Sequence, residues 1–201
     1  MSKRSNRKYS ISRRLGECLW GGKKDPQNKK NYPPGMHGPK KIKRITQYGQ
    51  QLLSKQKIKN YYGNIKEKQF FNIYKNAKKY IGNTSENIIK LLEIRLDSFI
   101  YRCKFAPTIF AARQYINHKH FTVNGIIINI PSYRIKINDI IKIRERSKKI
   151  NFSYKKKIKQ EIPEYIDINN NNDTAILLKI PKLSDIPVEF KPHHIIEFYS
   201  K

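Results

Sequence analysis

The chain has 201 residues, a formal net charge of +28 at pH 7 and 38% hydrophobic residues, a length that allows one large or two small domains with a hydrophobic core. Its apolar runs fall short of the roughly 18 residues of a membrane span. Two cysteines are too few for a disulfide framework or a four-cysteine zinc site.

The charge is distributed unevenly along the chain. Residues 1–60 hold 17 Lys and Arg against 2 acids, whereas residues 161–201 hold 4 against 7. A basic front and a near-neutral tail indicate a polyanionic partner, and we favour nucleic acid over a membrane surface. A solvated basic surface, or an AT-rich codon bias that inflates Lys, Asn, Ile and Tyr, is the alternative for part of the lysine count.

The first 47 residues show no sustained hydrophobic period and contain several Gly and Pro turn signals. We expect an extended arm that does not fold alone and is ordered by a partner. Its cations come in clusters such as Arg13-Arg14, and Tyr32 and His37 are suited to stack on exposed bases or ribose. The segment up to Arg14 also resembles a transit peptide, but we interpret it as part of the mature surface.

Two helices are predicted next, over 50–61 and 66–80. Phe70, Tyr74, Ala77 and Ile81 form the expected core stripe of the second helix. Thr84 or Ser85 is then expected to cap a further helix, whose apolar stripe begins at Ile88.

Residues 91–143 are expected to form a small unit of their own. Leu92, Leu96, Phe99, Ile100 and Cys103 recur at helical spacing as one buried stripe, with Arg95 and Arg102 on another face of the same helix. A second helix is predicted from the Thr108 cap to Asn117, with its outer face formed by Arg113, Gln114 and Asn117 and its inner face by Ile109, Ala112 and Ile116.

Strands are predicted after these helices. Asn124-Gly125 between two apolar triplets indicates a two-residue hairpin. We expect a further strand over 140–144, and a loop over 169–172 between strands near Asp167 and Leu177. The hairpin residues expected to face the helices are Phe121, Val123, Ile126 and Ile128.

Several short motifs support a family resemblance. They are Glu93-Ile94-Arg95-Leu96-Asp97, Tyr101-Arg102, Ala111-Ala112-Arg113-Gln114, His118-Lys119-His120 and Val123-Asn124-Gly125. Together they resemble the RNA-binding domain named after ribosomal protein S4, a module that also occurs in pseudouridine synthases, some methylases and tyrosyl-tRNA synthetases. The flanks resemble the ribosomal family itself, through the segments 31–38, 48–49, 51–52, 55–57, 61–63, 82–84 and 195–201.

The resemblance implies a structural constituent of the small ribosomal subunit, with no enzymatic activity and no cofactor. It implies binding to a multi-helix junction in the five-prime domain of small-subunit rRNA, an early role in assembly, an influence on translational accuracy, and the neighbours S5 and S3. The implied location is the small subunit of an AT-rich bacterium or of the mitochondrial matrix. Neither a membrane nor a small-molecule substrate is expected.

Recognition of RNA shape is the expected mechanism, because A-form RNA hides base edges in a deep, narrow groove. Arg95, Arg102, Arg113 and Lys119 are expected to form a rigid cationic face. The residues that we expect at the rRNA are Arg13, Arg14, Tyr32, Gly35, His37, Gly38, Tyr48, Gly49, Lys55, Gln56, Lys57, Arg95, Arg102, Arg113, Gln114, Asn117, His118, Lys119 and Asn124.

Departures from the family pattern concern three places. Met36 stands where Gln is usual, Ile126 and Ile127 follow the hairpin turn where Lys or Arg is common, and the arm has only Cys18 of a possible four-cysteine zinc site. No catalytic constellation is evident, and His118 and His120 lack a third metal ligand. The alternative functions are a stand-alone RNA-modifying enzyme or RNA chaperone, and a translational repressor that binds mRNA.

The predicted fold class is α+β. A mostly helical N-terminal lobe with a basic extended arm, residues 1–88, is expected to be completed by C-terminal strands and tail, residues 156–201. The inserted RNA-binding module, residues 89–155, is expected to pack two helices on a short, mostly antiparallel sheet.

Overall fold

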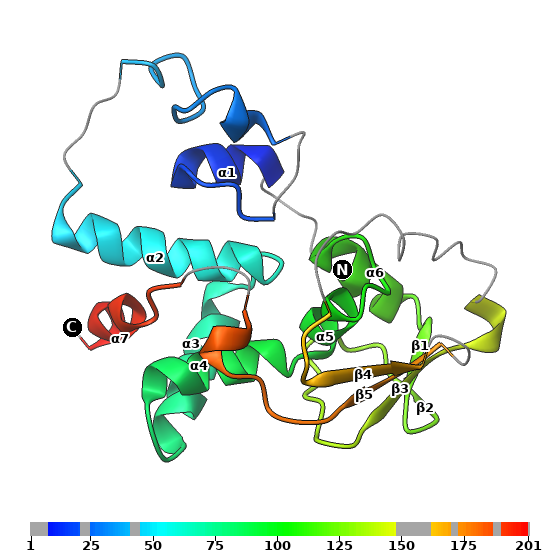
Figure 1. Ribbon diagram of the computed structural model, residues 1–201. Coiled ribbons are helices and arrows are strands. Elements are labelled where there is room, and N and C mark those ends of the chain that lie inside the picture. Colours follow the sequence, from blue (N-terminus) through cyan, green and yellow to red (C-terminus); the bar gives the residue numbers. More distant parts are fainter. Residues whose placement is uncertain are drawn as a thin grey trace. The chain divides into compact units, whose positions relative to one another are not determined.

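The computed structural model confirms the α+β class and divides the chain into two compact units, Met1–Phe71 with Val188–Lys201, and Asn72–Pro187 (Figure 1). We call them unit one and unit two. The structure describes residues 8–20, 25–40, 45–147, 162–169, 173–186 and 190–200. Residues 148–161, which hold the end of the predicted module and the start of the predicted C-terminal segment, lie outside these ranges.

Unit one is built around two helices that are far apart in the sequence. Helices α2 (Gln47–Tyr61) and α7 (His193–Tyr199) lie side by side (Figure 1). The Gln51 side chain donates to Glu197 at 2.9 Å, and the rings of Tyr48 and Phe198 stack at 5.6 Å. The tail therefore packs back on the body of this unit, as predicted. The buried residues of the two helices and of the segments beside them include Ile58, Tyr61, Tyr62, Phe190 and Ile195.

The arm contains an element that the sequence pattern did not predict. Helix α1 (Lys8–Leu15) is followed by a short 3-10 helix, Pro26–Asn28. Eight residues are too few to show a period, but Ile11 is buried and Gly16 ends the helix with a φ of 75° and an N–H bond to the Ser12 carbonyl. The buried Trp20 indole donates to the Tyr61 carbonyl at 3.3 Å. The arm is therefore anchored by packing within this unit.

Helix α3 (Glu67–Lys79) follows the predicted range closely, and Phe70, Tyr74 and Ala77 are buried. Ile81 was predicted in the same stripe, but it is fully exposed because the helix ends at Lys79.

Helix α4 (Thr84–Glu93) begins one residue after its cap, which is Asn83 and not Thr84 or Ser85. The Asn83 side chain accepts from the Ser85 N–H at 2.9 Å, as expected of an Asn cap.

The long helix predicted through the module is two helices, α4 and α5 (Leu96–Arg102). Arg95 has an extended backbone between them and forms a β-bridge with Arg134. The Leu96 N–H donates to the Tyr133 carbonyl, and the Ile135 N–H donates to the Ile94 carbonyl. These bonds stabilise the extended backbone between the two helices. All five residues of the predicted stripe are nevertheless buried.

Helix α6 (Ile109–Asn117) has the predicted limits, cap and inner face. The Thr108 hydroxyl accepts from the Ala111 N–H at 3.1 Å. Ile109, Ala112 and Ile116 are buried.

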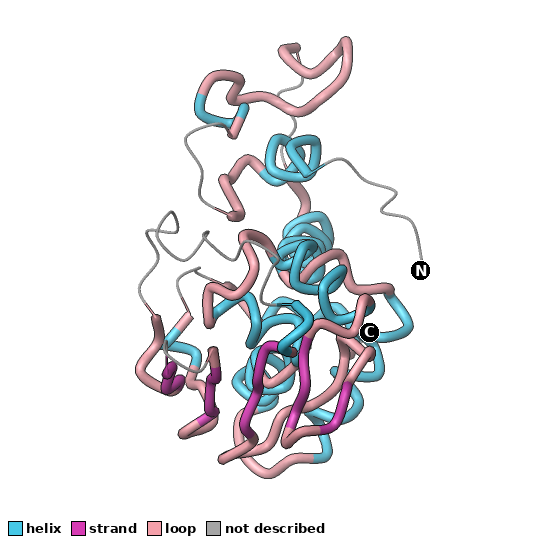
Figure 2. The backbone as a smooth tube through the Cα atoms, turned by 90° about the vertical axis from the view of Figure 1, so that its right-hand side faces the viewer, coloured by secondary structure: helices cyan, strands magenta, loops and turns pink. Residues whose placement is uncertain are grey.

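Unit two also holds an antiparallel sheet of five strands in the order β2-β1-β3-β5-β4. Figure 2 draws the strands in magenta. The strands are β1 (Phe121–Val123), β2 (Ile126–Ile127), β3 (Ile140–Ile143), β4 (Ile166–Asn169) and β5 (Thr174–Leu177). Burial alternates along β3: Ile141 and Ile143 are buried, whereas Ile140 and Lys142 are exposed, so one face of the sheet packs on the core. Phe105, which follows α5, stacks on Phe121 at 6.2 Å.

The C-terminal strands complete this sheet and not the N-terminal lobe, which corrects the predicted domain assignment. Ile140 and Ile141 of β3 pair with Ile176 and Ala175 of β5, and β4 pairs on the outer side. Ala175 and Leu177 are fully buried in this arrangement. Burial of their apolar side chains against the module is a sufficient reason for the pairing.

The hairpin turn is confirmed, since Asn124 and Gly125 have φ values of 50° and 81° and join paired strands. Phe121 and Val123 face the core as predicted. Ile126 was predicted to do the same, but it is 67% exposed because β2 is the two-residue edge strand of the sheet.

Candidate nucleic-acid interface

The C-terminal end of α6 presents a polar surface. Gln114, His118 and Lys119 are exposed, and Asn117 is half-buried beside them. Gln114 and Asn117, which were predicted on the outer face of this helix, therefore lie at the surface. We call these four residues the α6 surface.

The end of α6 is held in place by bonds from both sides. The Lys119 N–H bonds to the Ile116 carbonyl at 2.8 Å, and Lys119 has a left-handed φ of 61°. Arg144, which follows β3, donates through Nη1 to the Lys119 carbonyl at 2.9 Å. His120 Nδ1 lies 2.9 Å from the Ser147 hydroxyl. Arg144 was not among the predicted site residues, although its position at the end of a predicted strand was a usable signal.

Arg113 precedes the α6 surface in the sequence, and most of its side chain is buried. Its Nε lies 3.3 Å from an Asp97 carboxylate oxygen, and its side chain is 25% exposed. Burial lowers the pKa of Arg113, Asp97 opposes this shift and Arg95 adds to it. The guanidinium nevertheless stays charged, because the pKa of arginine starts far above neutrality.

Arg95 and Arg102 do not lie on an exposed cationic face, which corrects the prediction. Arg95 donates from Nε and Nη2 to Asp97 at 3.0 and 2.7 Å, and Arg102 donates from the same atoms to Glu93 at 3.1 and 2.6 Å. Both arginines are at least 94% buried. Bidentate pairing with buried carboxylates makes them structural residues.

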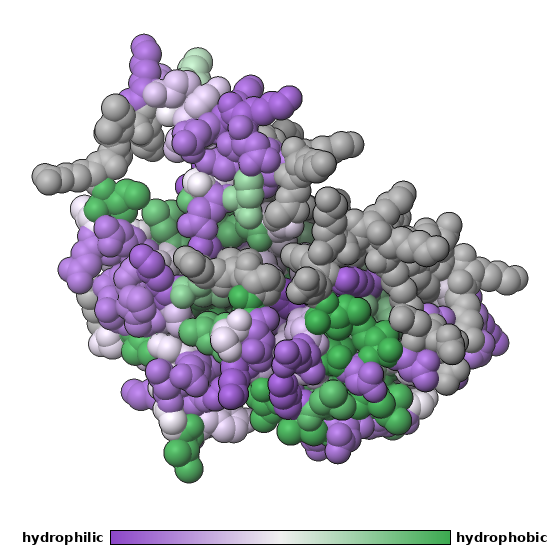
Figure 3. All heavy atoms as spheres, viewed as in Figure 1, coloured by the Kyte–Doolittle hydropathy of each residue, from purple (hydrophilic) through white to green (hydrophobic). Residues whose placement is uncertain are grey.

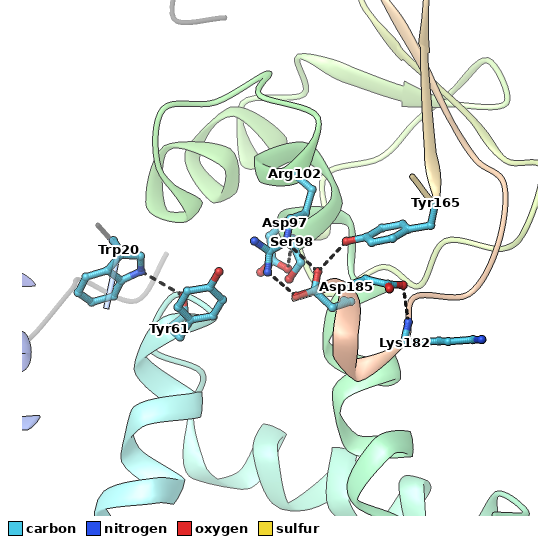
Figure 4. Close-up of polar contacts among 9 residues, drawn as sticks. Trp20, Tyr61, Asp97, Ser98, Arg102, Tyr165, Lys182 and Asp185 are labelled. Atoms are coloured by element: carbon cyan, nitrogen blue, oxygen red, sulfur yellow. Dashed lines mark hydrogen bonds and ion pairs between the residues drawn. The ribbon is translucent and has the colours of Figure 1, made fainter. Parts of the chain in front are cut away.

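The Tyr165 hydroxyl also joins the buried Glu93 carboxylate, at 3.3 Å, and so connects the residue before β4 to helix α4. Figure 4 shows Arg102 and Tyr165 pointing towards the same carboxylate. Burial raises the pKa of Tyr165, and the neighbouring negative charge of Glu93 raises it further. The hydroxyl therefore stays protonated and donates this bond.

Asn124 lies in the exposed hairpin turn, but its side chain closes the turn. The amide nitrogen donates to Asp139 at 2.9 Å, and the amide oxygen accepts from the Ile140 N–H at 2.9 Å. The predicted contact of Asn124 with RNA would therefore compete with bonds that fix the turn.

Unit one contains the arm loop, residues 31–38, whose backbone carbonyls accept hydrogen bonds from Arg13. Arg13 donates to the Tyr32 and Pro33 carbonyls at 3.2 Å each, and its guanidinium lies 4.9 Å from the centre of the Tyr32 ring. Arg13 is half-buried and Arg14 is exposed. We infer that Arg13 shapes the loop, while Arg14 is available to a partner.

The loop itself depends on two glycines. Gly35 has a φ of 113°, which side-chain-bearing residues rarely adopt, and a Cβ on Gly38 would lie 2.1 Å from the Pro33 carbonyl oxygen. Met36 and His37 between them are exposed. The loop is therefore a tight turn that presents these two side chains.

The predicted residues of α2 divide into exposed and structural groups. Tyr48 is 54% exposed on its stack with Phe198, whereas Gln56 and Lys57 are half-buried. Gly49 is tightly packed, because a Cβ there would lie 3.0 Å from the Ile45 side chain. Lys57 forms an ion pair with Glu17.

Lys55 was predicted at the RNA, but it is buried, which is a further correction. Its Nζ lies 2.9 Å from Glu67 and 3.9 Å from the centre of the Phe198 ring. Burial disfavours the Glu67 carboxylate, but hydrogen bonds from Lys59, Tyr199 and Lys55 outweigh it and lower the pKa of Glu67 to about 2. The Lys55 ammonium therefore stabilises the packing of α2 within unit one through Glu67 and Phe198.

The surface in Figure 3 is predominantly hydrophilic over the helices of unit one. Among the described residues, no group of three or more His, Cys, Asp or Glu side chains is arranged to hold a metal ion. None of the helices in the described ranges is long and apolar enough to cross a membrane.

Comparison with known proteins identifies the family. The family model for the ribosomal protein S4/S9 N-terminal domain matches residues 3–93, and that for the S4 domain matches residues 94–141. Proteins called small ribosomal subunit protein uS4 are similar over their whole length and over the whole of this chain: 47% identical in Rhizobium leguminosarum bv. trifolii, 46% in Nitrobacter winogradskyi and 48% in Maricaulis maris. The chain therefore belongs to the uS4 family of small ribosomal subunit proteins.

Proposed function

We propose that this chain is a structural protein of the small ribosomal subunit that binds the subunit's rRNA. The observation that carries the proposal is the α6 surface, where Gln114, Asn117, His118 and Lys119 extend from a helix end fixed by Arg144. Amide, imidazole and ammonium groups on a rigid element suit recognition of phosphates and 2′-hydroxyls of folded RNA. Family membership over the whole chain supports the ribosomal role.

Unit one supplies a second set of RNA contacts in this proposal. Arg14, His37 and Tyr48 are exposed in the arm, the arm loop and α2. A cation and two aromatic rings on this unit suit a phosphate backbone and unstacked bases. Gly35 and Gly38 shape the loop, and Gln56 and Lys57 lie on the adjoining helix.

Membership of the family also suggests where on the rRNA this chain binds and which proteins lie beside it. We infer binding at a multi-helix junction of the five-prime domain, early in subunit assembly, with S5 and S3 as neighbours and an influence on translational accuracy. The relatives named above are bacterial, which favours a bacterial over a mitochondrial ribosome. A stand-alone RNA-modifying or chaperone activity is less favoured, because the similarity covers the entire chain.

Binding to a five-prime-domain rRNA fragment, compared with an arbitrary duplex of equal length, tests the proposal. We expect a clear preference for the fragment at physiological ionic strength. Lys119→Ala and Gln114→Ala should each weaken this binding. Lys182→Ala should not, because Lys182 is an exposed lysine in the C-terminal segment, outside the α6 surface. Equal affinity for both RNAs, or equal losses in all three variants, would contradict the proposal.

Association with the ribosome is a separate test in cells. A tagged full-length chain should co-sediment with small subunits and resist moderate salt washing. Recovery only in fractions that lack ribosomal subunits would contradict the ribosomal role.

A further inference from the structure

A buried charge cluster lies at the base of Arg113. Arg95 and Arg113 share the carboxylate of Asp97, which is fully buried. One Asp97 oxygen accepts from Arg95 Nε and from the Ser98 N–H, both at 3.0 Å. The other accepts from Arg95 Nη2 at 2.7 Å and lies 3.3 Å from Arg113 Nε.

We propose that Asp97 is a positioning residue for RNA binding, which with Arg95 anchors Arg113 through Nε and presents its guanidinium to an RNA phosphate next to Gln114 and Asn117. The inference deepens the proposed function and rests on it. Arg95 takes part through Asp97 and does not touch the RNA in this arrangement, since it is buried.

A flexible side chain loses rotamer freedom when it binds a partner, and this loss weakens binding. Because the contact with Asp97 already restricts the Arg113 side chain, less freedom is lost when RNA binds. Arg113 contacts Asp97 while part of its side chain, 25%, remains exposed. Arg95 is a like charge within the same cluster and acts against the Arg113 charge. An approaching phosphate would form charge-assisted hydrogen bonds with the exposed part of the Arg113 guanidinium.

The neighbouring buried pair of Arg102 and Glu93 has the same bidentate geometry as the pair of Arg95 and Asp97. One arginine meets one carboxylate there, and Tyr165 occupies a further position on Glu93. Figure 4 shows Arg102, Asp97 and Tyr165 within this part of unit two. The pair connects helices α4 and α5 with the residue before β4, so it provides a matched control in the same core.

The experiment uses full-length double variants that preserve net charge. Arg95→Met with Asp97→Asn removes one positive and one negative charge and retains an amide oxygen for the Ser98 N–H. Arg102→Met with Glu93→Gln does the same at the control pair. Replacing a whole buried ion pair by neutral groups is often tolerated, whereas removal of one partner is not.

We expect the first double variant to bind the rRNA fragment on the order of tenfold more weakly, as loss of one charge-assisted contact predicts. The control should bind within about twofold of the wild type. Against an Arg113→Ala background, the Arg95 and Asp97 substitutions should cause no further loss. Wild-type affinity in the first double variant, or an undiminished loss in the Arg113→Ala background, would overturn the positioning role.

A second measurement is made on the wild-type chain without RNA, and a variant is used only to assign the signal. The Arg113 Nε–H signal in ¹⁵N NMR spectra of the wild-type chain, assigned by its disappearance in Arg113→Lys, should exchange slowly with solvent. A freely exchanging Nε–H would overturn the inference. If Arg113→Ala leaves RNA affinity unchanged, the proposed function of this surface fails instead, and the two failures are thereby distinguished.

Discussion

Two lysines with left-handed backbone torsions allow stability and RNA binding to be separated. Lys119 follows α6 with a φ of 61°, and Lys104 follows α5 with a φ of 60°. Each N–H bonds back to the helix, Lys104 to the Tyr101 carbonyl and Lys119 to the Ile116 carbonyl. Glycine is the usual residue at this position of a helix end, because it has no Cβ.

Lys119→Gly should therefore stabilise the fold. A left-handed conformation costs an L-residue about 1–2 kcal/mol, while glycine loses roughly 0.5–1 kcal/mol more chain entropy on folding. We expect the free energy of unfolding to rise by about 0.5–1 kcal/mol, and Tm by about 1–4 °C for a chain of this size. Thermal unfolding followed by circular dichroism measures this change.

The same variant should bind RNA more weakly, because Lys119 is exposed on the proposed surface. Loss of one phosphate contact should reduce the slope of log K against log salt by about 0.7–0.9. The affinity of the rRNA fragment, measured at four or five salt concentrations, gives this slope.

Lys104→Gly is the matched control, since it relieves the same torsion outside the α6 surface. It should raise Tm in the same direction and leave the salt slope unchanged. An unchanged slope for Lys119→Gly, or equal changes for the two variants, would refute the assignment of Lys119 to the RNA surface. A fall in Tm for both would refute the argument from backbone torsion.

Three further predictions concern unit one. The pKa of Glu67 is about 2 in the folded chain against 4.5 as its ordinary value, so its ionised form stabilises the fold above about pH 4.5, and this contribution is lost as the pH falls towards 2. Glu67→Gln should flatten Tm against pH across that window, and an unchanged curve would contradict the assignment. Gly38→Ala should distort the arm loop, because its Cβ would meet the Pro33 oxygen at 2.1 Å; we expect weaker binding of the rRNA fragment with little change in Tm, and wild-type affinity would argue against a role for the loop. Trp20→Phe removes the indole bond to the Tyr61 carbonyl and should lower the free energy of unfolding by about 1–2 kcal/mol in urea titrations. An unchanged free energy of unfolding would contradict a stabilising role of this bond.

Local chemistry in the sequence was enough for several elements. Thr108 and the spacing of Ile109, Ala112 and Ile116 predicted α6, since capping and helical periodicity depend on neighbouring residues alone. Asn124-Gly125 predicted the hairpin turn for the same reason, because these residues tolerate a positive φ. The charge asymmetry and the family motifs likewise indicated an RNA-binding protein before any contact was known.

The tertiary structure alone decided which cations are available to a partner. Arg95, Arg102 and Lys55 have the same charge as Lys119, but each of the three is buried against a carboxylate. That difference depends on where Asp97, Glu93 and Glu67 lie in space, and helical spacing does not encode it. The pairing of β4 and β5 with β3 was also settled by tertiary contacts, because strands distant in sequence pair wherever their apolar faces are buried together.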